Sequence, residues 1–228
     1  MSARHHVVAV ALAECFRGDA EILASGIGLL PGLGAQLARA TFAPDLITTD
    51  DAWFPYRTIF DVVWSGRRHV IMGASQIDRF GNQNIACIGD PARPRAQLLG
   101  MRGAPGNTIN HATSYFVPAH GRRVFVPRVD VVTGIGTDRA AALGRAGRFH
   151  DLRRVVSNLA VLDFCGPERS MRLVSVHPGV TVDQVIEATG FPLALADPVT
   201  TTRAPSAEEL AILRRLDPDD RAAREVAA

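Results

Sequence analysis

The sequence lacks lysine entirely: all 25 of its basic residues are arginine. Without a lysine amine the chain forms no Schiff base with a carbonyl substrate, and it has no P-loop lysine to bind nucleotide phosphates. Neither kind of chemistry can therefore come from this chain.

Metal-binding and disulfide patterns are missing as well. The three cysteines, Cys15, Cys87 and Cys165, form no CxxC pair and have no zinc spacing, which indicates reduced thiols in a cytoplasmic protein. The seven histidines show neither an H-x-x-x-H nor an H-E-x-x-H pattern. We therefore predict no metal site.

The chain also has no large charge excess and no long apolar run. Its formal net charge is only +2, so its composition does not indicate a nucleic-acid partner. No apolar run reaches the length of a membrane-spanning helix, so we expect no membrane insertion. A short apolar run at residues 7–13 follows a basic start, but Glu14 stands where a signal peptide needs a small residue. We predict a buried strand there, in a soluble cytoplasmic protein.

What is present is the alternation typical of an α/β protein. With 228 residues, 47% of them hydrophobic, the chain can bury one large core. A glycine-rich turn precedes helical spacing over residues 32–42, and short apolar runs follow at 46–47 and 70–73. We expect a single α/β domain over residues 1–205, followed by a C-terminal helix and charged tail over 206–228.

The second half of the chain predicts further strands. Residues 122–136 are rich in β-branched side chains and predict one or two strands. Residues 150–167 and 171–180 predict a pair of antiparallel strands, joined by a turn at Gly166 and Pro167.

Two helices are predicted near the C-terminus. The first is capped by Thr181 and stops at Gly190, and the second is capped by Ser206. From Asp217 onward the chain is charged and is expected to be mobile. The apolar face of the first helix is expected to consist of Val182, Val185 and Ile186.

Residues 100–116 read GMRGAPGNTINHATSYF, a composition that argues against a core strand or helix. The backbone N–H groups of such a glycine-rich loop are suited to hold a developing oxyanion. A surface turn that needs positive φ is the alternative. We expect this loop and the polar loops at 48–53 and 75–84 to follow strands, where open α/β sheets bind ligands.

Four segments, in order along residues 7–192, resemble the β subunit of the family I CoA-transferases. They are RRHVIMGASQIDRFGNQNIA, GMRGAPGNTIN, VVSNLAVLDF and HPGVTVDQVIEATG. The resemblance implies an open, mostly parallel sheet flanked by helices, of the CoA-transferase type. It also implies an α subunit of similar fold, in a heterodimer or α2β2 heterotetramer, with the active site between the subunits. Coenzyme A would enter as part of an acyl-CoA substrate, with no permanently bound cofactor.

The chain departs from that family at the catalytic motif. Transferases carry S-E-N-G, whose glutamate attacks the acyl-CoA and then holds CoA as a thioester. Here the matching residues are Thr49, Asp50, Asp51 and Ala52. Asp50 takes the place of the glutamate with one methylene less, and a solvated turn or helix cap is the alternative role for both aspartates. The segment between this motif and the next strand is also shorter than is usual in the family.

In the glycine loop an arginine replaces a glycine of the family's G-x-G-G-A pattern. Arg102 offers a charged fork for a carboxylate or enolate oxygen, or it points to solvent. Arg102 and Asp50 are the predicted catalytic residues. The resemblance adds backbone donors from the loop and polar side chains as substrate-binding residues: Gly103, Ala104, Gly106, Asn107, Asn84 and Arg79.

Two further patterns weigh against a broader site. The segment from Asp78 to Gly81 has the composition of a tight turn, so a structural role for Arg79 and its neighbours is an alternative. Ser114 does not stand in a G-x-S-x-G elbow, so we predict no hydrolytic triad with His111 and Asp130.

In lacking this glutamate, the sequence resembles one branch of the family. Enzymes of that branch open a carbon ring of a cyclic acyl-CoA by hydrolysis in bacterial steroid catabolism. We expect a β subunit of this kind, with the general base on the α subunit. One alternative is a genuine CoA-transferase that moves CoA between carboxylic acids. The other is a non-catalytic structural subunit that completes the active site of the α subunit.

Overall fold

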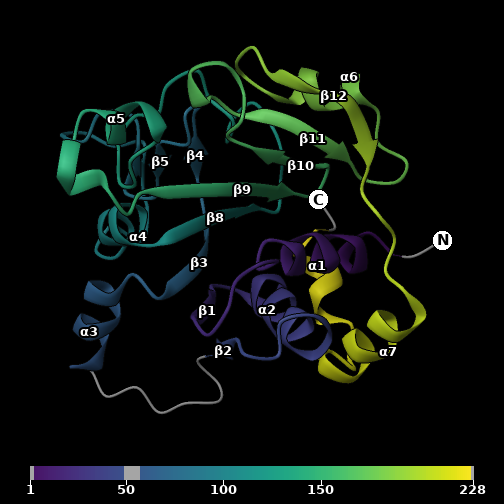
Figure 1. Ribbon diagram of the computed structural model, residues 1–228. Coiled ribbons are helices and arrows are strands. Elements are labelled where there is room, and N and C mark those ends of the chain that lie inside the picture. Colours follow the sequence, from purple (N-terminus) through teal and green to yellow (C-terminus); the bar gives the residue numbers. More distant parts are fainter. Residues whose placement is uncertain (1–2, 49–56, 227–228) are drawn as a thin grey trace.

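An eight-stranded sheet runs through the molecule in the order β12-β11-β10-β9-β8-β3-β1-β2 (Figure 1). The structure is a computed structural model that describes residues 3–48 and 57–226. Neighbouring strands are parallel except at β9–β10 and β10–β11, which confirms the expected open, mostly parallel sheet. The strands are β1 (Leu23–Gly26), β2 (Ile47–Thr48), β3 (Arg68–Gly73), β8 (Ala112–Val117), β9 (Asp151–Ser157), β10 (Ala160–Asp163), β11 (Arg172–Val176) and β12 (Ala194–Thr201).

Helices and two small hairpins surround the sheet. None of the helices in the described part of the chain is long and apolar enough to cross a membrane. The hairpins are β4 (Gln76–Ile77) with β5 (Gln83–Asn84), and β6 (Cys87–Ile88) with β7 (Ala96–Gln97). The helices are α1 (Arg4–Glu14), α2 (Leu29–Thr41), α3 (Thr58–Ser65), α4 (Ala104–Asn110), α5 (Thr137–Ala141), α6 (Val182–Ala188) and α7 (Ala207–Leu216), with 3-10 turns η1 (Gly144–Gly147), η2 (Pro167–Arg169) and η3 (Arg221–Glu225).

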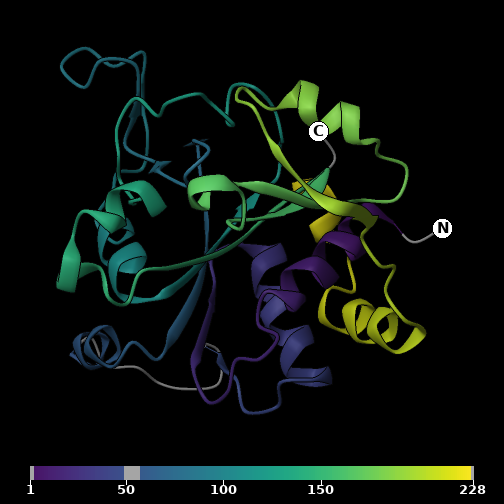
Figure 2. The ribbon, with the colours of Figure 1, turned by 45° about the horizontal axis from the view of Figure 1, so that its top comes forward.

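The two faces of the sheet bury separate apolar cores. In β3, Ile71 belongs to one core, whereas Val70 and Met72 belong to the other, because successive strand side chains point to opposite faces. Helices α1, α2 and α7 cover the face of Ile71 and lie together on that side of the sheet in both ribbon views (Figures 1 and 2). Burial on both faces is the normal state of a parallel sheet.

Residues 7–13 form part of helix α1, so the predicted first strand is wrong. All seven side chains are buried. A helix that is buried all round shows no 3.6-residue alternation, and its sequence then resembles that of a buried strand. α1 packs closely on α2 because Gly34 leaves space: a Cβ at that position would lie 2.7 Å from Leu12 Cβ.

Residues 100–116 contain helix α4 and most of strand β8, contrary to the expectation of neither. β8 lies between β3 and β9, and all six of its residues are buried. Its sequence, ATSYFV, starts with small and polar residues, so it lacks the apolar signature of a central strand. The glycine loop therefore follows hairpin strand β7 and leads into β8 through α4, rather than following a strand of the main sheet.

Residues 122–136 form no strand, although their β-branched residues predicted one or two. They contribute two isolated bridges, from Phe125 to Ile77 and from Gly134 to Gln83. Pro127 lacks the N–H group that a continued ladder requires. The predicted antiparallel pair is confirmed in β10 and β11, and the first of its two segments also supplies β9.

The predicted helix caps near the C-terminus are confirmed. Thr181 and Ser206 each form a reciprocal capping box with the third residue of the helix that follows. Ile186 is 40% exposed, so it does not belong to the buried face of α6, unlike Val185. The helix ends at Ala188, two residues before the predicted stop.

The charged tail is packed rather than mobile between residues 217 and 226. Ala222 and Val226 are buried. The Glu225 carboxylate accepts hydrogen bonds from the N–H groups of Leu29 at 3.3 Å and Leu30 at 3.0 Å. The first turn of α2 is thus capped by a side chain from the far end of the described chain.

Candidate functional site

The glycine loop ends in the first turn of α4. Gly100 has φ of +97°, a conformation that favours glycine, and Gly103 is the cap of the helix. The Ala104 N–H group donates a hydrogen bond to the Met101 carbonyl at 3.2 Å. As an oxyanion donor Ala104 would first have to release this bond, whereas Gly106 is the third residue of the helix itself.

Arg102 lies on this loop and is exposed. Among the described residues its guanidinium has no ion-pair or hydrogen-bond partner. The neighbouring Leu99 and Met101 are 99% and 46% exposed, so an unpaired charge and two apolar side chains stand on the same loop. Such a surface is typical of a binding site. The second predicted catalytic residue, Asp50, lies outside the described residues.

Asn107 holds α4 against the sheet. Its Oδ1 accepts a hydrogen bond from Arg68 Nη1 at 2.8 Å, and its Nδ2 lies 3.1 Å from Met72 Sδ as a donor. Arg68 Nε donates in turn to Ser25 Oγ of β1 at 3.0 Å. The oxygen and the nitrogen of the Asn107 amide therefore both have partners within the chain. Asn107 thus has a structural role, which is to hold the helix that follows the glycine loop.

Asn84 is fully buried and has no polar atom left for a substrate. Its Nδ2 donates to Gln76 Oε1 and to the Cys87 carbonyl, both at 2.7 Å. Its Oδ1 accepts from the Ala86 N–H at 2.9 Å. These bonds tie hairpin β4–β5 to the start of β6, which is a structural role.

Arg79 lies in the tight turn between β4 and β5. Its guanidinium stands 4.5 Å from the centre of the Phe80 ring, and Nη2 is 4.0 Å from Glu168 Oε2 in η2. Asp78 Oδ1 accepts from the Phe80 N–H at 3.0 Å, and Gly81 has φ of +81°. The turn interpretation of this segment is confirmed, and the guanidinium of Arg79 contacts Phe80 and Glu168 rather than Arg102.

An aspartate, a histidine and a serine that no motif indicates are joined inside the protein. His69 Nδ1 lies 2.7 Å from Asp19 Oδ2, and His69 Nε2 lies 2.9 Å from Ser114 Oγ. This is the bonding order of a hydrolytic triad. Ser114 and His69 are completely buried, however, so no substrate reaches the hydroxyl and the arrangement is structural.

The charges of this buried group are set by its surroundings. Burial lowers the pKa of His69 against the opposing effect of Asp19, which keeps the imidazole neutral. Burial raises the pKa of Asp19, but its bonds to His69 and Arg153 outweigh that effect and hold the pKa below its usual value. Arg153 Nη1 donates to Asp19 Oδ1 at 2.6 Å.

The rejected triad of His111, Ser114 and Asp130 does not assemble. Neither ring nitrogen of His111 has a hydrogen-bond partner, and Asp130 accepts from Gln76 Nε2 at 3.0 Å. Burial, and after it the charge of Arg68, lowers the pKa of His111 to about 4. The side chain is therefore a neutral core residue.

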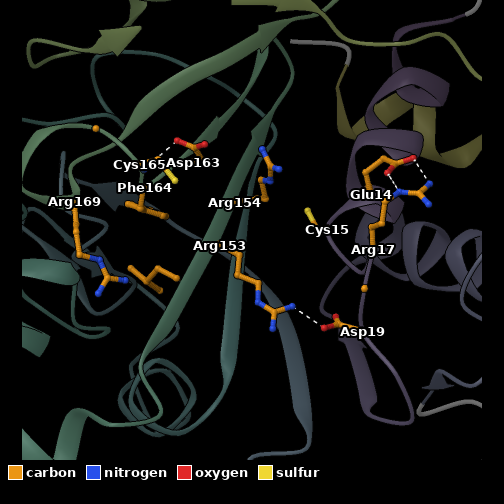
Figure 3. A pocket seen from close by; sticks show the side chains of 13 residues that line it. Glu14, Cys15, Arg17, Asp19, Arg153, Arg154, Asp163, Phe164, Cys165 and Arg169 are labelled. Atoms are coloured by element: carbon orange, nitrogen blue, oxygen red, sulfur yellow. Dashed lines mark hydrogen bonds and ion pairs between the residues drawn. The ribbon is translucent and has the colours of Figure 1, made fainter. Parts of the chain in front are cut away.

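A cleft of about 840 Å³ lies between the end of α1 and strands β9 and β10 (Figure 3). Arg153 reaches across it to Asp19. In the described part of the chain, Arg154 and Arg169 border the cleft without a hydrogen-bond or ion-pair partner for their guanidinium groups. The cleft is thus suited to receive an anionic group. Sequence reasoning missed it because its walls come from segments more than a hundred residues apart.

Known proteins resemble this chain in both sequence and fold. No family model matches the chain. The chain is 48% identical over 242 residues to the cholesterol ring-cleaving hydrolase IpdB subunit of Rhodococcus jostii, covering 98% of this chain and 96% of that protein. The IpdB subunit of Mycobacterium tuberculosis is 47% identical over 248 residues, or 99% of both chains.

A solved structure and a more distant relative extend the comparison. The crystal structure of Rhodococcus jostii RHA1 IpdAB contains a chain that is 48% identical, with a TM-score of 0.95 and coverage of 100% of this chain and 99% of that one. The B subunit of the 3-oxoadipate CoA-transferase from Pseudomonas knackmussii is 31% identical over 223 residues, covering 84% and 85% of the two chains. The chain therefore belongs to the protein family formed by the IpdB ring-cleaving hydrolase subunits and the CoA-transferase B subunits.

Proposed function

We propose that this chain is the β subunit of a two-subunit hydrolase that opens a carbon ring of a cyclic acyl-CoA during steroid breakdown. The observation that carries the proposal is the 48% identity to an IpdB subunit over 98% of the chain, together with a TM-score of 0.95.

The sequence supports hydrolysis rather than CoA transfer. Transfer in this family depends on a glutamate that becomes a thioester, and the chain has no glutamate between Glu21 and Glu168. Asp50 stands at the matching position with a shorter side chain, and a displaced nucleophile loses most of its advantage. A water molecule then takes the role of the attacking group.

The chemistry is a hydrolytic C–C cleavage. Water, deprotonated by a base on the α subunit, adds to a ring ketone and forms an alkoxide. The alkoxide collapses to a carboxyl group while the adjacent C–C bond breaks, and the bonding electrons form the enolate of the CoA thioester. The enolate then takes up a proton. One water is consumed, and CoA stays attached to the product.

In this reaction Arg102 stabilises the negative oxygen. Its guanidinium is exposed and unpaired among the described residues, so it needs to break no ion pair before it binds an anion. A fixed positive charge at the oxygen lowers the barrier most where water is excluded. Such exclusion requires a cover, which the α subunit would supply; the relative from Rhodococcus jostii was solved as IpdAB.

The test uses this chain assembled with its α partner. A cyclic β-keto acyl-CoA is incubated with the complex in water labelled with oxygen-18. The products are then separated, and their masses are measured by mass spectrometry. We expect a product that gains the mass of one labelled water and still carries CoA. Free thiol should not appear, because the thioester bond is not broken.

Two results would reject the proposal. Product formation that requires a second carboxylic acid, with a hydroxylamine-sensitive enzyme–CoA thioester, would establish a transferase instead. The 31% identity to a CoA-transferase chain makes this the alternative to exclude. Full turnover by the α subunit without this chain would establish a dispensable role for it.

A further inference from the structure

The two ends of the described chain bring three metal-ligating side chains together. His5 and His6 lie in the first turn of α1, and Asp220 directly precedes η3. One ligand atom from each of the three lies within 4.8 Å of the others. The two imidazole rings have their centres 4.0 Å apart.

The contact between His5 and Asp220 is close but is not a hydrogen bond. His5 Nε2 lies 2.7 Å from Asp220 Oδ1, yet the orientation leaves this buried nitrogen without a hydrogen-bond partner. The His5 residue is only 5% exposed. A buried polar atom without a partner needs an explanation. A bound metal ion would explain it, because the ion could be shared by this nitrogen and the neighbouring carboxylate.

We propose that His5, His6 and Asp220 bind a divalent transition-metal ion, with Zn²⁺ as the reference ion. Imidazole nitrogen and carboxylate oxygen are the ligands that zinc takes in proteins, usually in a tetrahedral arrangement. A small cavity of about 10 Å³ adjoins all three side chains, which is the space of a single ion or water.

A fourth ligand is available from the same cavity. Asp217 lines it as well, and its Oδ2 accepts a hydrogen bond from the Ala222 N–H at 2.8 Å. Metal–ligand bonds of about 2.0–2.1 Å place ligand atoms about 3.3 Å apart. Small rotations reach that spacing, because the Asp220 side chain is 61% exposed and can move.

The ion would connect the first turn of α1 to the segment before η3. Glu225 of η3 already bonds to the first turn of α2, so the metal would add a tie from the neighbouring residue Asp220 to the other N-terminal helix, α1. The proposed ring opening uses none of these residues. The metal is therefore structural, and its binding energy appears as added stability of the folded state.

The experiment measures Zn²⁺ binding to the chelator-stripped two-subunit complex by isothermal titration calorimetry. The variants His5→Gln, His6→Gln and Asp220→Asn are compared with the wild type, and His150→Gln serves as the control histidine outside the cluster. We expect each of the three variants to lose one bound Zn²⁺ per β chain or to bind it at least about tenfold more weakly. The control should match the wild type.

Thermal unfolding gives a second measurement on the same proteins. Zn²⁺ should raise the Tm of the wild type and of His150→Gln, with no such rise in the three variants. The proposal is overturned if the wild type binds no Zn²⁺ at about 0.1 mM, or if His6→Gln and Asp220→Asn bind it as the wild type does. Those two variants change partly exposed side chains, so they decide the question even if His5→Gln does not fold.

Discussion

Asn107 Oδ1 accepts a hydrogen bond from Arg68 Nη1 at 2.8 Å, and this contact fastens α4 to strand β3. Replacement of Asn107 by leucine leaves a half-buried guanidinium without its acceptor. We expect the free energy of unfolding to fall by about 1–3 kcal/mol, measured by urea denaturation. Arg102→Ala, on the same loop but exposed, is the control and should change it by less than about 0.5 kcal/mol. Equal stability of the two variants would contradict the anchoring role.

Arg102→Ala in the assembled complex should lower kcat/KM by about 10²-fold, because a charged contact to the developing oxyanion is lost. Arg102→Lys should fall between the alanine variant and the wild type, since an ammonium keeps the charge but not the two-pronged geometry. Arg123→Ala removes another exposed arginine and should leave turnover unchanged. If Arg102→Ala stays within about twofold of the wild type, the guanidinium does not act in the reaction.

Two glycines of helix α2 should respond to alanine with opposite signs. A Cβ at Gly34 would lie 2.7 Å from Leu12 Cβ and 3.1 Å from the Ala13 backbone nitrogen, whereas a Cβ at Gly32 meets nothing within 4 Å. Gly34→Ala should therefore destabilise the chain by about 1–3 kcal/mol through overpacking. Gly32→Ala should stabilise it by roughly 0.5–1 kcal/mol through helix propensity. Urea unfolding of both variants gives the comparison, and the same sign for both would contradict the α1–α2 packing.

The buried histidines should make the protein sensitive to acid. Burial lowers the pKa of His177 from 6.5 to about 4, so between these values the unfolded chain binds a proton that the folded chain does not. The stability from this group is fully present above pH 6.5 and is lost as the pH falls toward 4, by about 1.4 kcal/mol per pH unit. His120, with a pKa lowered by burial to about 3, acts in the same direction.

The measurement is the free energy of unfolding at pH 7 and pH 5 for the wild type and for His177→Gln. The wild type should lose about 2 kcal/mol more than the variant over this interval. His177 bonds to Thr202 Oγ1 at 3.0 Å and to the Ser157 carbonyl at 2.8 Å, so the variant is also expected to be less stable at pH 7. The decisive quantity is the pH slope, and equal slopes would refute the assignment.

The parts of the fold with local signals were predictable. The caps at Thr181 and Ser206 are set by short-range hydrogen bonds, and the sequence displays both partners of each capping box. Helix α1 was misjudged because burial on all sides removes its periodicity. Strand β8 was missed because neighbouring strands, rather than its own apolar pattern, place it in the middle of the sheet.

The candidate site was predictable only where one segment carries it. The family motif pointed to the segment of Arg102, Gly103 and Asn107, in which Gly103 is the cap of α4 and Asn107 lies within that helix. Asn84 and Arg79 lie in the matching motif too, yet one is saturated by hydrogen bonds and the other supports a turn. The link from Asp19 through His69 to Ser114 joins positions 50 and 45 residues apart, and no spacing rule connects them.

The bond between Glu225 and the first turn of α2 sets an order of events during synthesis. The acceptor of the Leu30 N–H, the Glu225 carboxylate, is synthesised 195 residues later. At about 5–20 residues per second, this delay is roughly 10–40 s. Throughout that time the first turn of α2 lacks this acceptor. The layer formed by α1, α2 and α7 can therefore reach its final form only after translation has passed residue 225.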